Sequence, residues 1–311
     1  MSLKHFRSLC LAAFVAAISF GCISFSTNVH ANGQTHPLIS PAKQSISLEP
    51  GEHYEGTFSV HNVGSEDFSY TVYATPYSAI DENYSIDYTN QNSYTQISEW
   101  ISFDITSGHL DPGEVQEIKY TVDVPMNVPG GGQYAALMVE TGDTRDQHNI
   151  GVVNRIGMVL YSDVSGETVK KGKVLENKIP RFFLSPPITA TSIVENTGNV
   201  HDDAVYILRV YPLFSNEEIY SNEEESLANS RVIMPETRRF VSQSWDGAPR
   251  LGIFRVQQEV RIFDDTSIEQ KYVIICPLWF IIIIILIIIA VIYWQVSKRR
   301  SIKREQKEKT V

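Results

Sequence analysis

The chain has 311 residues, three cysteines and a formal net charge of −10. This length allows two domains of ordinary size between the terminal segments, each with its own hydrophobic core. The cysteines stand at 10, 22 and 276, so they predict no disulfide or cysteine-bound metal in the middle of the chain, and the acidic balance argues against nucleic acid as a partner.

The N-terminus has the features of a secretory signal peptide, which we place at residues 1–31. Two basic residues precede an apolar run over residues 9–25, and Val-His-Ala closes the segment with small residues at the cleavage positions. A lipoprotein signal ending at Cys22 is the alternative, because a glycine precedes that cysteine. We expect residues 32–44 to be a flexible leader.

Residues 45–166 predict an immunoglobulin-like β-sandwich. Short runs of β-branched and aromatic residues alternate with polar ones and are broken by Gly, Pro, Asn and Asp. Two alternating strands, Tyr54–Asn62 and Phe68–Thr75, flank the turn signal Asn-Val-Gly, and later strands are expected over residues 115–124 and 150–162.

An insertion from Tyr77 to Tyr94 interrupts this domain and carries four tyrosines among Asn, Asp and Ser. Tyrosine and asparagine supply flat apolar area with adaptable hydrogen bonding, a composition typical of binding loops and of surfaces that stack on sugars. We therefore predict a binding surface formed by Tyr77, Tyr84, Tyr88 and Tyr94. The alternative is that some of these rings only cover the hydrophobic end of the sandwich.

A second sandwich is predicted over residues 180–271, after a lysine-rich segment at 167–179 that is expected to be an exposed linker or an edge. It repeats the signals of the first domain in the same order, including an Asn-x-Gly turn and a Pro-x-x-Gly-x-aromatic motif, which occurs at Pro129–Tyr134 and again at Pro249–Phe254. This order indicates an internal duplication. We interpret the glycines of the motif as a corner where the chain passes from one sheet to the other at close approach.

The C-terminal segment predicts one transmembrane helix at residues 272–294. The run Val273–Trp294 contains 22 residues without a charge, enough to cross the hydrocarbon core of a bilayer. The tail at 295–311 holds seven basic and two acidic residues, which places it in the cytoplasm by the positive-inside rule. The ectodomain, with 17 basic and 34 acidic residues, is then outside the cell.

Catalytic motifs are missing from the sequence. The histidines form no His-x-x-x-His pair, and no Gly-x-Ser-x-Gly elbow occurs. We predict a binding protein rather than an enzyme, with no catalytic residues, no cofactor and no metal.

Several first-domain motifs resemble the WxL-interacting surface proteins of bacteria. They are Leu-Glu-Pro-Gly-Glu at 48–52, the strand that ends at Asn62-Val63-Gly64, Tyr-Ala-Thr-Pro at 73–76, residues 97–103, and the stretch from Val124-Pro125 to Tyr134. The resemblance implies a cell-surface protein with two immunoglobulin-like domains and a membrane anchor, whose first domain binds peptidoglycan and whose partners include secreted WxL-domain proteins. The second domain, with Trp245-Asp246-Gly247, matches that family less clearly.

From these features we predict a membrane-anchored bacterial surface protein that binds cell-wall peptidoglycan, another surface protein, or both. The alternative is a structural stalk or assembly partner that pairs with envelope proteins at an exposed strand edge and binds no glycan. A wall hydrolase or a sensor subunit is a third possibility, but an enzyme would need a catalytic cluster that only the fold could assemble.

Overall fold

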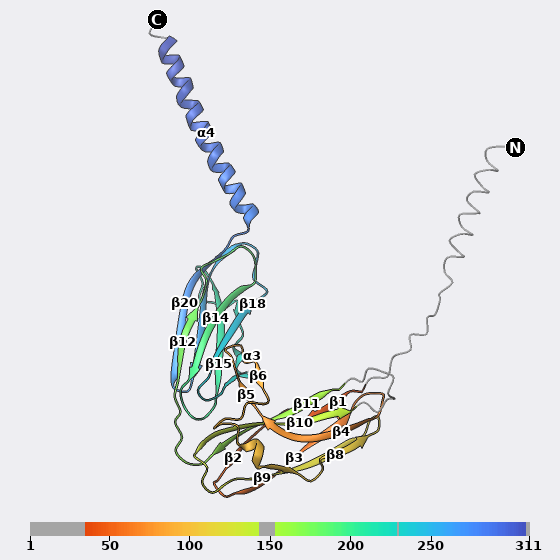
Figure 1. Ribbon diagram of the computed structural model, residues 1–311. Coiled ribbons are helices and arrows are strands. Elements are labelled where there is room, and N and C mark those ends of the chain that lie inside the picture. The colour runs from red at the N-terminus through yellow and green to blue at the C-terminus, as the bar shows by residue number, and fades with distance from the viewer. Residues whose placement is uncertain (1–34, 143–152, 229, 309–311) are drawn as a thin grey trace, which may run out of the picture.

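The computed structural model describes residues 35–142, 153–228 and 230–308, which form two all-β sandwiches followed by one long helix (Figure 1). The predicted fold class is confirmed. The predicted signal peptide at residues 1–31 lies outside the described residues.

The first domain consists of two sheets packed face to face. One sheet has the order β1-β3-β9-β7 and the other β2-β11-β10-β4-β8. The strands are β1 (Pro37–Ser40), β2 (Lys43–Leu48), β3 (His53–Asn62), β4 (Phe68–Pro76), β7 (Ile101–Phe103), β8 (Ser107–Leu110), β9 (Val115–Asp123), β10 (Gly131–Gly142) and β11 (Arg155–Val164). Alternate residues of β3 and β9 point inward, so Phe58, Val60, Ile118 and Tyr120 meet in one core.

The second domain has the orders β12-β14-β18 and β13-β20-β19-β15-β16, with β17 also paired to β15. The strands are β12 (Gly172–Lys178), β13 (Phe182–Phe183), β14 (Ile188–Asn196), β15 (Asp202–Pro212), β16 (Tyr220–Ser221), β17 (Arg231–Ile233), β18 (Arg238–Trp245), β19 (Gly252–Ile262) and β20 (Asp265–Ile275); the short helix α3 (Glu223–Ala228) packs beside β15. Its core falls into two clusters, one around Trp245 and Phe254 and the other around Tyr206.

The two domains share one strand plan, as the internal duplication predicts. In each, the last strand pairs in parallel with a short early strand, β11 with β2 and β20 with β13. The repeated Asn-x-Gly turns also have the same internal bonds. Asn62 and Asn196 are both buried, and each side-chain amide donates to two backbone carbonyls while its oxygen accepts the N–H of the glycine two residues later.

The structure shows strands in the expected leader and in the segment expected to be an exposed linker or an edge. In the expected leader, β1 pairs antiparallel with β3, and β2 begins at Lys43. In the expected linker, β12 pairs antiparallel with β14. Both segments complete sheets whose other strands lie later in the sequence, and β12 exposes Lys173 and Lys178 in the manner of a charged edge strand.

The apolar C-terminal run is divided between a strand and a helix. Val273 and Ile275 are fully buried as the end of β20, and α4 (Leu278–Glu308) begins just after Pro277. The part of α4 long and apolar enough to cross a membrane is Leu278–Lys298, 21 residues with a mean hydropathy of 2.8. The span therefore starts five residues later than the charge-free run suggests.

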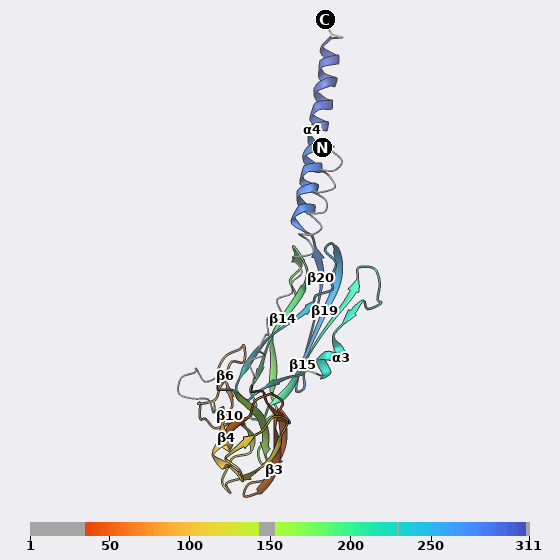
Figure 2. The same cartoon turned by 90° about the vertical axis from the view of Figure 1, so that its right-hand side faces the viewer.

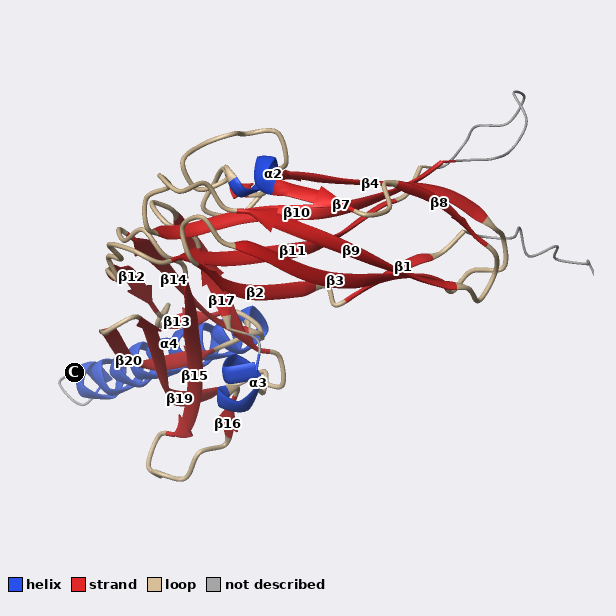
Figure 3. Ribbon diagram, turned by 90° about the horizontal axis from the view of Figure 1, so that it is seen from below, coloured by secondary structure: helices blue, strands red, loops and turns tan. Residues whose placement is uncertain are grey.

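The domains meet end to end at an angle. Figures 1 and 2 show α4 leaving the second domain at the end opposite the first domain, and Figure 3 shows the strands of the two domains running in different directions. The junction between the domains is therefore the place where side chains from both sandwiches meet, well away from the helix.

Candidate binding site between the two domains

The predicted tyrosine insertion folds against the second domain. It contains the short hairpin strands β5 (Ser78–Ala79) and β6 (Ile86–Asp87) and leads to the helical turn α2 (Ile97–Trp100). The N–H of Phe240 on β18 donates to the carbonyl oxygen of Glu82, 2.6 Å away. The insertion thus extends the contact between the domains.

Tyr84 is the main side chain of this contact. Its hydroxyl accepts the N–H of Met234 at 2.6 Å and lies 2.7 Å from Oγ1 of Thr237, both in the second domain. The guanidinium of Arg239 covers its ring, 4.1 Å from the ring centroid. Burial raises the pKa of the Tyr84 phenol above its usual value. The hydroxyl and one ring face of Tyr84 are therefore used by the joint between the domains.

The three glycines before Tyr134 lie at the same joint. The N–H of Gly132 donates to the carbonyl oxygen of Asn199 at 2.7 Å, and the side-chain amide of Asn199 donates back to Gly130 at 3.1 Å. Gly131 has a φ of +137°, and a Cβ there would stand 2.8 Å from the Asn199 carbonyl oxygen. The predicted corner is confirmed, because the chain passes here from β9 in one sheet of the first domain to β10 in the other. The glycines also allow the backbones of the two domains to touch.

The glycine two residues before each aromatic residue of the motif is needed for a different reason. A Cβ on Gly132 would lie 2.0 Å from the hydroxyl oxygen of Tyr134, and one on Gly252 would lie 2.7 Å from the ring of Phe254. Residues i and i+2 share a face of a strand, so each ring lies over its glycine. This explains the spacing of the repeated motif.

Tyr134 anchors an aromatic cluster at the junction. It is 1% exposed and meets Tyr161 edge to face, with 5.7 Å between ring centroids. His201 of the second domain packs on both rings, and its Nδ1 lies 3.3 Å from the Tyr134 hydroxyl. Burial raises the pKa of both phenols far above the usual value. The two phenols are therefore packed and neutral, and they form a firm base for the site above them.

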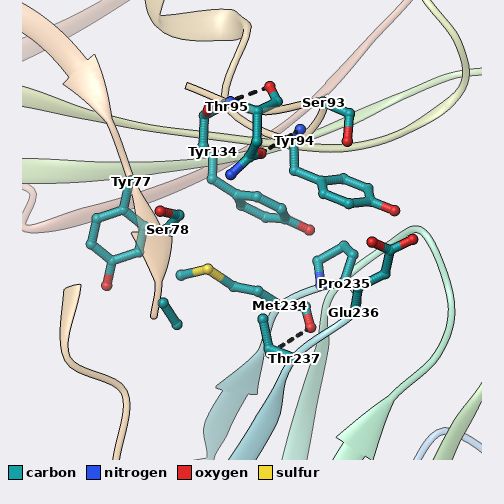
Figure 4. Close-up of a pocket in the computed structure, with 12 residues that line it drawn as sticks. Tyr77, Ser78, Ser93, Tyr94, Thr95, Tyr134, Met234, Pro235, Glu236 and Thr237 are labelled. Carbon is teal, nitrogen blue, oxygen red and sulfur yellow. Dashed lines mark hydrogen bonds between the residues drawn. The ribbon is translucent and has the colours of Figure 1, made fainter. Parts of the chain in front are cut away.

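A pocket of about 230 Å³ opens beside this cluster, between the insertion and one turn of the second domain (Figure 4). One side is formed by Tyr77, Tyr94 and Tyr134, and the other by residues 234–237. The remaining lining residues are Ser78, Ala79, Asn92, Ser93 and Thr95. Figure 4 shows the rings of Tyr94 and Tyr134 above Met234 and Pro235, with the Glu236 carboxylate near the Tyr94 hydroxyl.

The pocket wall is fixed to β10 by hydrogen bonds. The N–H of Tyr134 donates to the carbonyl oxygen of Tyr94 at 2.7 Å. The buried side chain of Gln133 donates to the carbonyl oxygen of Ser93 and accepts the N–H of Ile97. Burial, together with the nearby charge of Glu236, raises the pKa of Tyr94. The site thus offers neutral aromatic faces, hydroxyl groups and one carboxylate in a preformed shape.

The four predicted tyrosines separate into three positions. Tyr77 and Tyr94 line the pocket, Tyr84 joins the domains, and Tyr88 is 43% exposed with its ring 6.1 Å from that of Tyr77. Sequence reasoning missed Tyr134 and Glu236. Nothing in the sequence indicates that Glu236 faces the insertion, because that contact depends on the angle between the domains.

Among the described residues, no group of three or more His, Cys, Asp or Glu side chains is arranged to hold a metal ion. The chemistry of the pocket is that of non-covalent recognition: stacking on aromatic faces and hydrogen bonds to a carboxylate and hydroxyls.

Comparisons with known proteins give no family assignment. No family model and no curated protein matches the chain. Among solved structures, the class 5 fimbrial chaperone CfaA is 12% identical, with a TM-score of 0.38 over 76% of this chain and 99% of the chaperone. The YadV chaperone is 10% identical with the same score and coverage. The E. coli chaperone DraB is 9% identical, with a TM-score of 0.36 over 77% and 97% of the two chains. At these scores, the likeness says nothing about what this chain binds.

Proposed function

We propose that this chain is a membrane-anchored bacterial surface protein that binds cell-wall peptidoglycan in the pocket between its two sandwich domains. The observation that supports the proposal most is the preformed pocket in which Tyr94 and Tyr134 face Glu236 of the other domain. Hydrogen bonds from β10 hold the aromatic wall in place before any ligand arrives, so little ordering cost is left for binding.

The chemistry of the pocket suits a segment of peptidoglycan. Sugar rings present apolar faces that stack on tyrosine, and their hydroxyl and amide groups exchange hydrogen bonds with phenols and amides. The Glu236 carboxylate complements an amine of the peptide stem. The acidic ectodomain, with 17 basic and 34 acidic residues, would repel anionic polymers, and this favours the glycan and peptide part of the wall over its polyanions.

The anchor supports a surface location. The 21 residues of Leu278–Lys298 would extend about 31 Å as a helix, close to the thickness of the hydrocarbon core. The seven basic residues of the tail favour a cytoplasmic C-terminus. With a cleaved signal peptide, the ectodomain is then outside and the pocket faces the wall.

The resemblance to WxL-interacting proteins adds a second candidate ligand, a secreted surface protein. The outer edge of β18 supports it. Among the described residues, that edge has one backbone contact with the insertion, at Phe240; Ser242 lies beyond it, and the carbonyl oxygen of Ser244 accepts the side-chain hydroxyl of Tyr220. A partner strand could pair there. In that case the chain is an assembly partner, and the pocket is only a crevice at the domain joint.

Co-sedimentation with purified cell-wall sacculi tests the proposal. The ectodomain should extend to Ile275, because β20 ends there. We expect retention of the parent and a loss of about tenfold in affinity, equal to about 1.4 kcal/mol, for Tyr94→Ala and for Glu236→Gln. Phe214→Ala is the matched control, because Phe214 is 96% exposed on a turn and does not line the pocket.

Equal retention of the parent and both pocket variants would show that the protein binds sacculi at a site other than the pocket. Failure of the parent to sediment with sacculi at any practical concentration would reject glycan binding and leave the assembly partner as the better hypothesis.

A further inference from the structure

An exposed apolar patch covers the end of the second domain from which α4 leaves. It consists of Phe182, Leu184, Leu251, Ile253, Tyr272 and Ile274, each between 41% and 56% exposed. We call this set the base patch. Single exposed apolar residues are ordinary on protein surfaces, but a contiguous group of six large ones marks an interaction surface.

The strand register shows that the base patch is continuous. Phe182 on β13 pairs with Ile274 on β20, and Ile274 pairs with Ile253 on β19, so three outward side chains form one row across adjacent strands. Tyr272 lies two residues before Ile274 on β20, so it shares that side of the sheet, while Leu184 and Leu251 lie in the bends that directly follow β13 and precede β19.

The position of the base patch along the chain points to the lipid bilayer. Ile274 is four residues before Leu278, where the apolar helix begins, and Cys276 and Pro277 are the only residues between β20 and α4. Four residues span at most about 14 Å. If the hydrocarbon core begins near Leu278, the row at Ile274 lies at or just above the level of the lipid headgroups.

The charges around the base patch agree with this position. Arg181 and Arg250 are exposed and directly precede Phe182 and Leu251 in the sequence. The backbone oxygen of Arg181 accepts the N–H of Ile274, which keeps it beside the row. Arginine next to exposed aromatic and aliphatic side chains is a common composition for a surface that lies in the headgroup region, in spite of the acidic ectodomain as a whole.

We infer that the base patch is a membrane-contact surface that seats the second domain on a bilayer with anionic lipids. The inference rests on the proposed anchoring by α4. Contact at two places, the helix and the patch, would restrict tilting of the ectodomain. The strands β19 and β20 each have 11 residues, so the domain junction with its pocket would stand about 36 Å from the membrane.

Fluorescent labelling of the membrane-anchored chain tests this inference. The three native cysteines are replaced by serine, and a single cysteine carries an environment-sensitive dye at Leu251→Cys in the base patch. The matched control is Ile268→Cys, which is 59% exposed and lies at the other end of β20, away from the helix. Both proteins are reconstituted in vesicles of phosphatidylglycerol and phosphatidylethanolamine.

We expect the dye at position 251 to be quenched several-fold more by nitroxide-labelled lipid than the dye at 268, and less by aqueous iodide. Replacing Arg181 and Arg250 by alanine, or using phosphatidylcholine vesicles, should reduce this difference. Equal iodide quenching at both positions in protein that floats with the vesicles would overturn the inference while leaving the anchor intact. The dye at position 251 could instead become better protected from iodide as the amount of protein per vesicle rises, without being quenched by nitroxide-labelled lipid. This result would also overturn the inference and would assign the patch to contact with a second copy of the chain.

Failure of the chain to float with the vesicles would be a different result. It would reject the membrane anchor of the proposed function, and with it the basis of the inference.

Discussion

Two buried asparagines fix corresponding turns in the two domains. Asn196 is fully buried, donates to the carbonyl oxygens of Val200 and Ile233, and accepts the N–H of Gly198. If the side chain is removed, these backbone groups are left without a hydrogen-bond partner, because the site is closed to water. The turn therefore depends on this one residue, and Asn62 does the same in the first domain.

We expect Asn196→Ala to lower the free energy of unfolding of the second domain by roughly 3 kcal/mol, because buried backbone groups lose their partners. Urea unfolding followed by intrinsic fluorescence measures this, since Trp245 lies in that core. Asn127→Ala, at an exposed turn of the first domain, serves as the control. Equal stability of the two variants would show that the side chain of Asn196 contributes little.

The buried tyrosines at the junction predict a loss of stability at high pH. Burial raises the pKa of Tyr134 and Tyr161 in the folded chain, whereas an unfolded tyrosine ionises near pH 10. Above pH 10 the folded state therefore holds more protons than the unfolded state, and the free energy of unfolding falls as pH rises. Below pH 10 the contribution is fully present.

Each such tyrosine should lower the free energy of unfolding by about 1.4 kcal/mol per pH unit above pH 10. Urea titrations between pH 8 and about pH 11 measure the slope. Tyr161→Phe should flatten it relative to the parent measured beside it, because burial raises the pKa of this phenol. A slope unchanged by Tyr161→Phe would contradict the assignment.

At the level of elements, β10 connects the core of the first domain to the joint. Its first residue, Gly131, faces Asn199 with a φ of +137°, whereas a Cβ on its last residue, Gly142, would have no atom of the described residues within 4 Å. The two ends of one strand thus provide a matched pair of glycines, of which only Gly131 is constrained by the second domain.

Gly131→Ala should cost about 1–3 kcal/mol in the free energy of unfolding, from backbone strain and contact with Asn199. Gly142→Ala should change it by less than about 1 kcal/mol. The measurement is urea unfolding of both variants beside the parent. Similar values for the two would mean that the glycines do not serve the joint.

Local patterns in the sequence predict the elements that depend on neighbouring residues. Alternation predicts β3 and β4, the Asn-x-Gly turns predict the hydrogen-bonded turns, and the charge-free run predicts the helix. The same reasoning misses β1 and β12, because their pairing partners determine them more than their own residues do. It finds Tyr94 but misses Glu236, since their approach depends on how two separate sandwiches meet.

At the scale of the whole molecule, two sandwiches are held at one angle by a small joint. Tyr84 crosses that joint with its hydroxyl bonds to Met234 and Thr237. Because the pocket walls come from both domains, the angle also sets the shape of the pocket. Rigidity of the joint is therefore a condition for the proposed binding.

Tyr84→Phe removes only the hydroxyl and should weaken the joint by about 1 kcal/mol, because the N–H of Met234 loses its acceptor. Small-angle X-ray scattering of the ectodomain should then show a broader distribution of interdomain distances. Tyr88→Phe, in the exposed part of the same insertion, is the control. Identical scattering for parent and Tyr84→Phe would show that the other contacts are enough to hold the angle.

Binding of the cell wall at the domain junction can be observed in an NMR titration of the ectodomain, with ¹³C-labelled tyrosine rings, against soluble peptidoglycan fragments. The ring signals of Tyr94 and Tyr134 should shift with saturation, while those of Tyr54 and Tyr211, which do not line the pocket, should stay unchanged. Saturable shifts confined to tyrosines outside the pocket, or no shifts at millimolar fragment, would contradict the claim that the domain junction binds the cell wall.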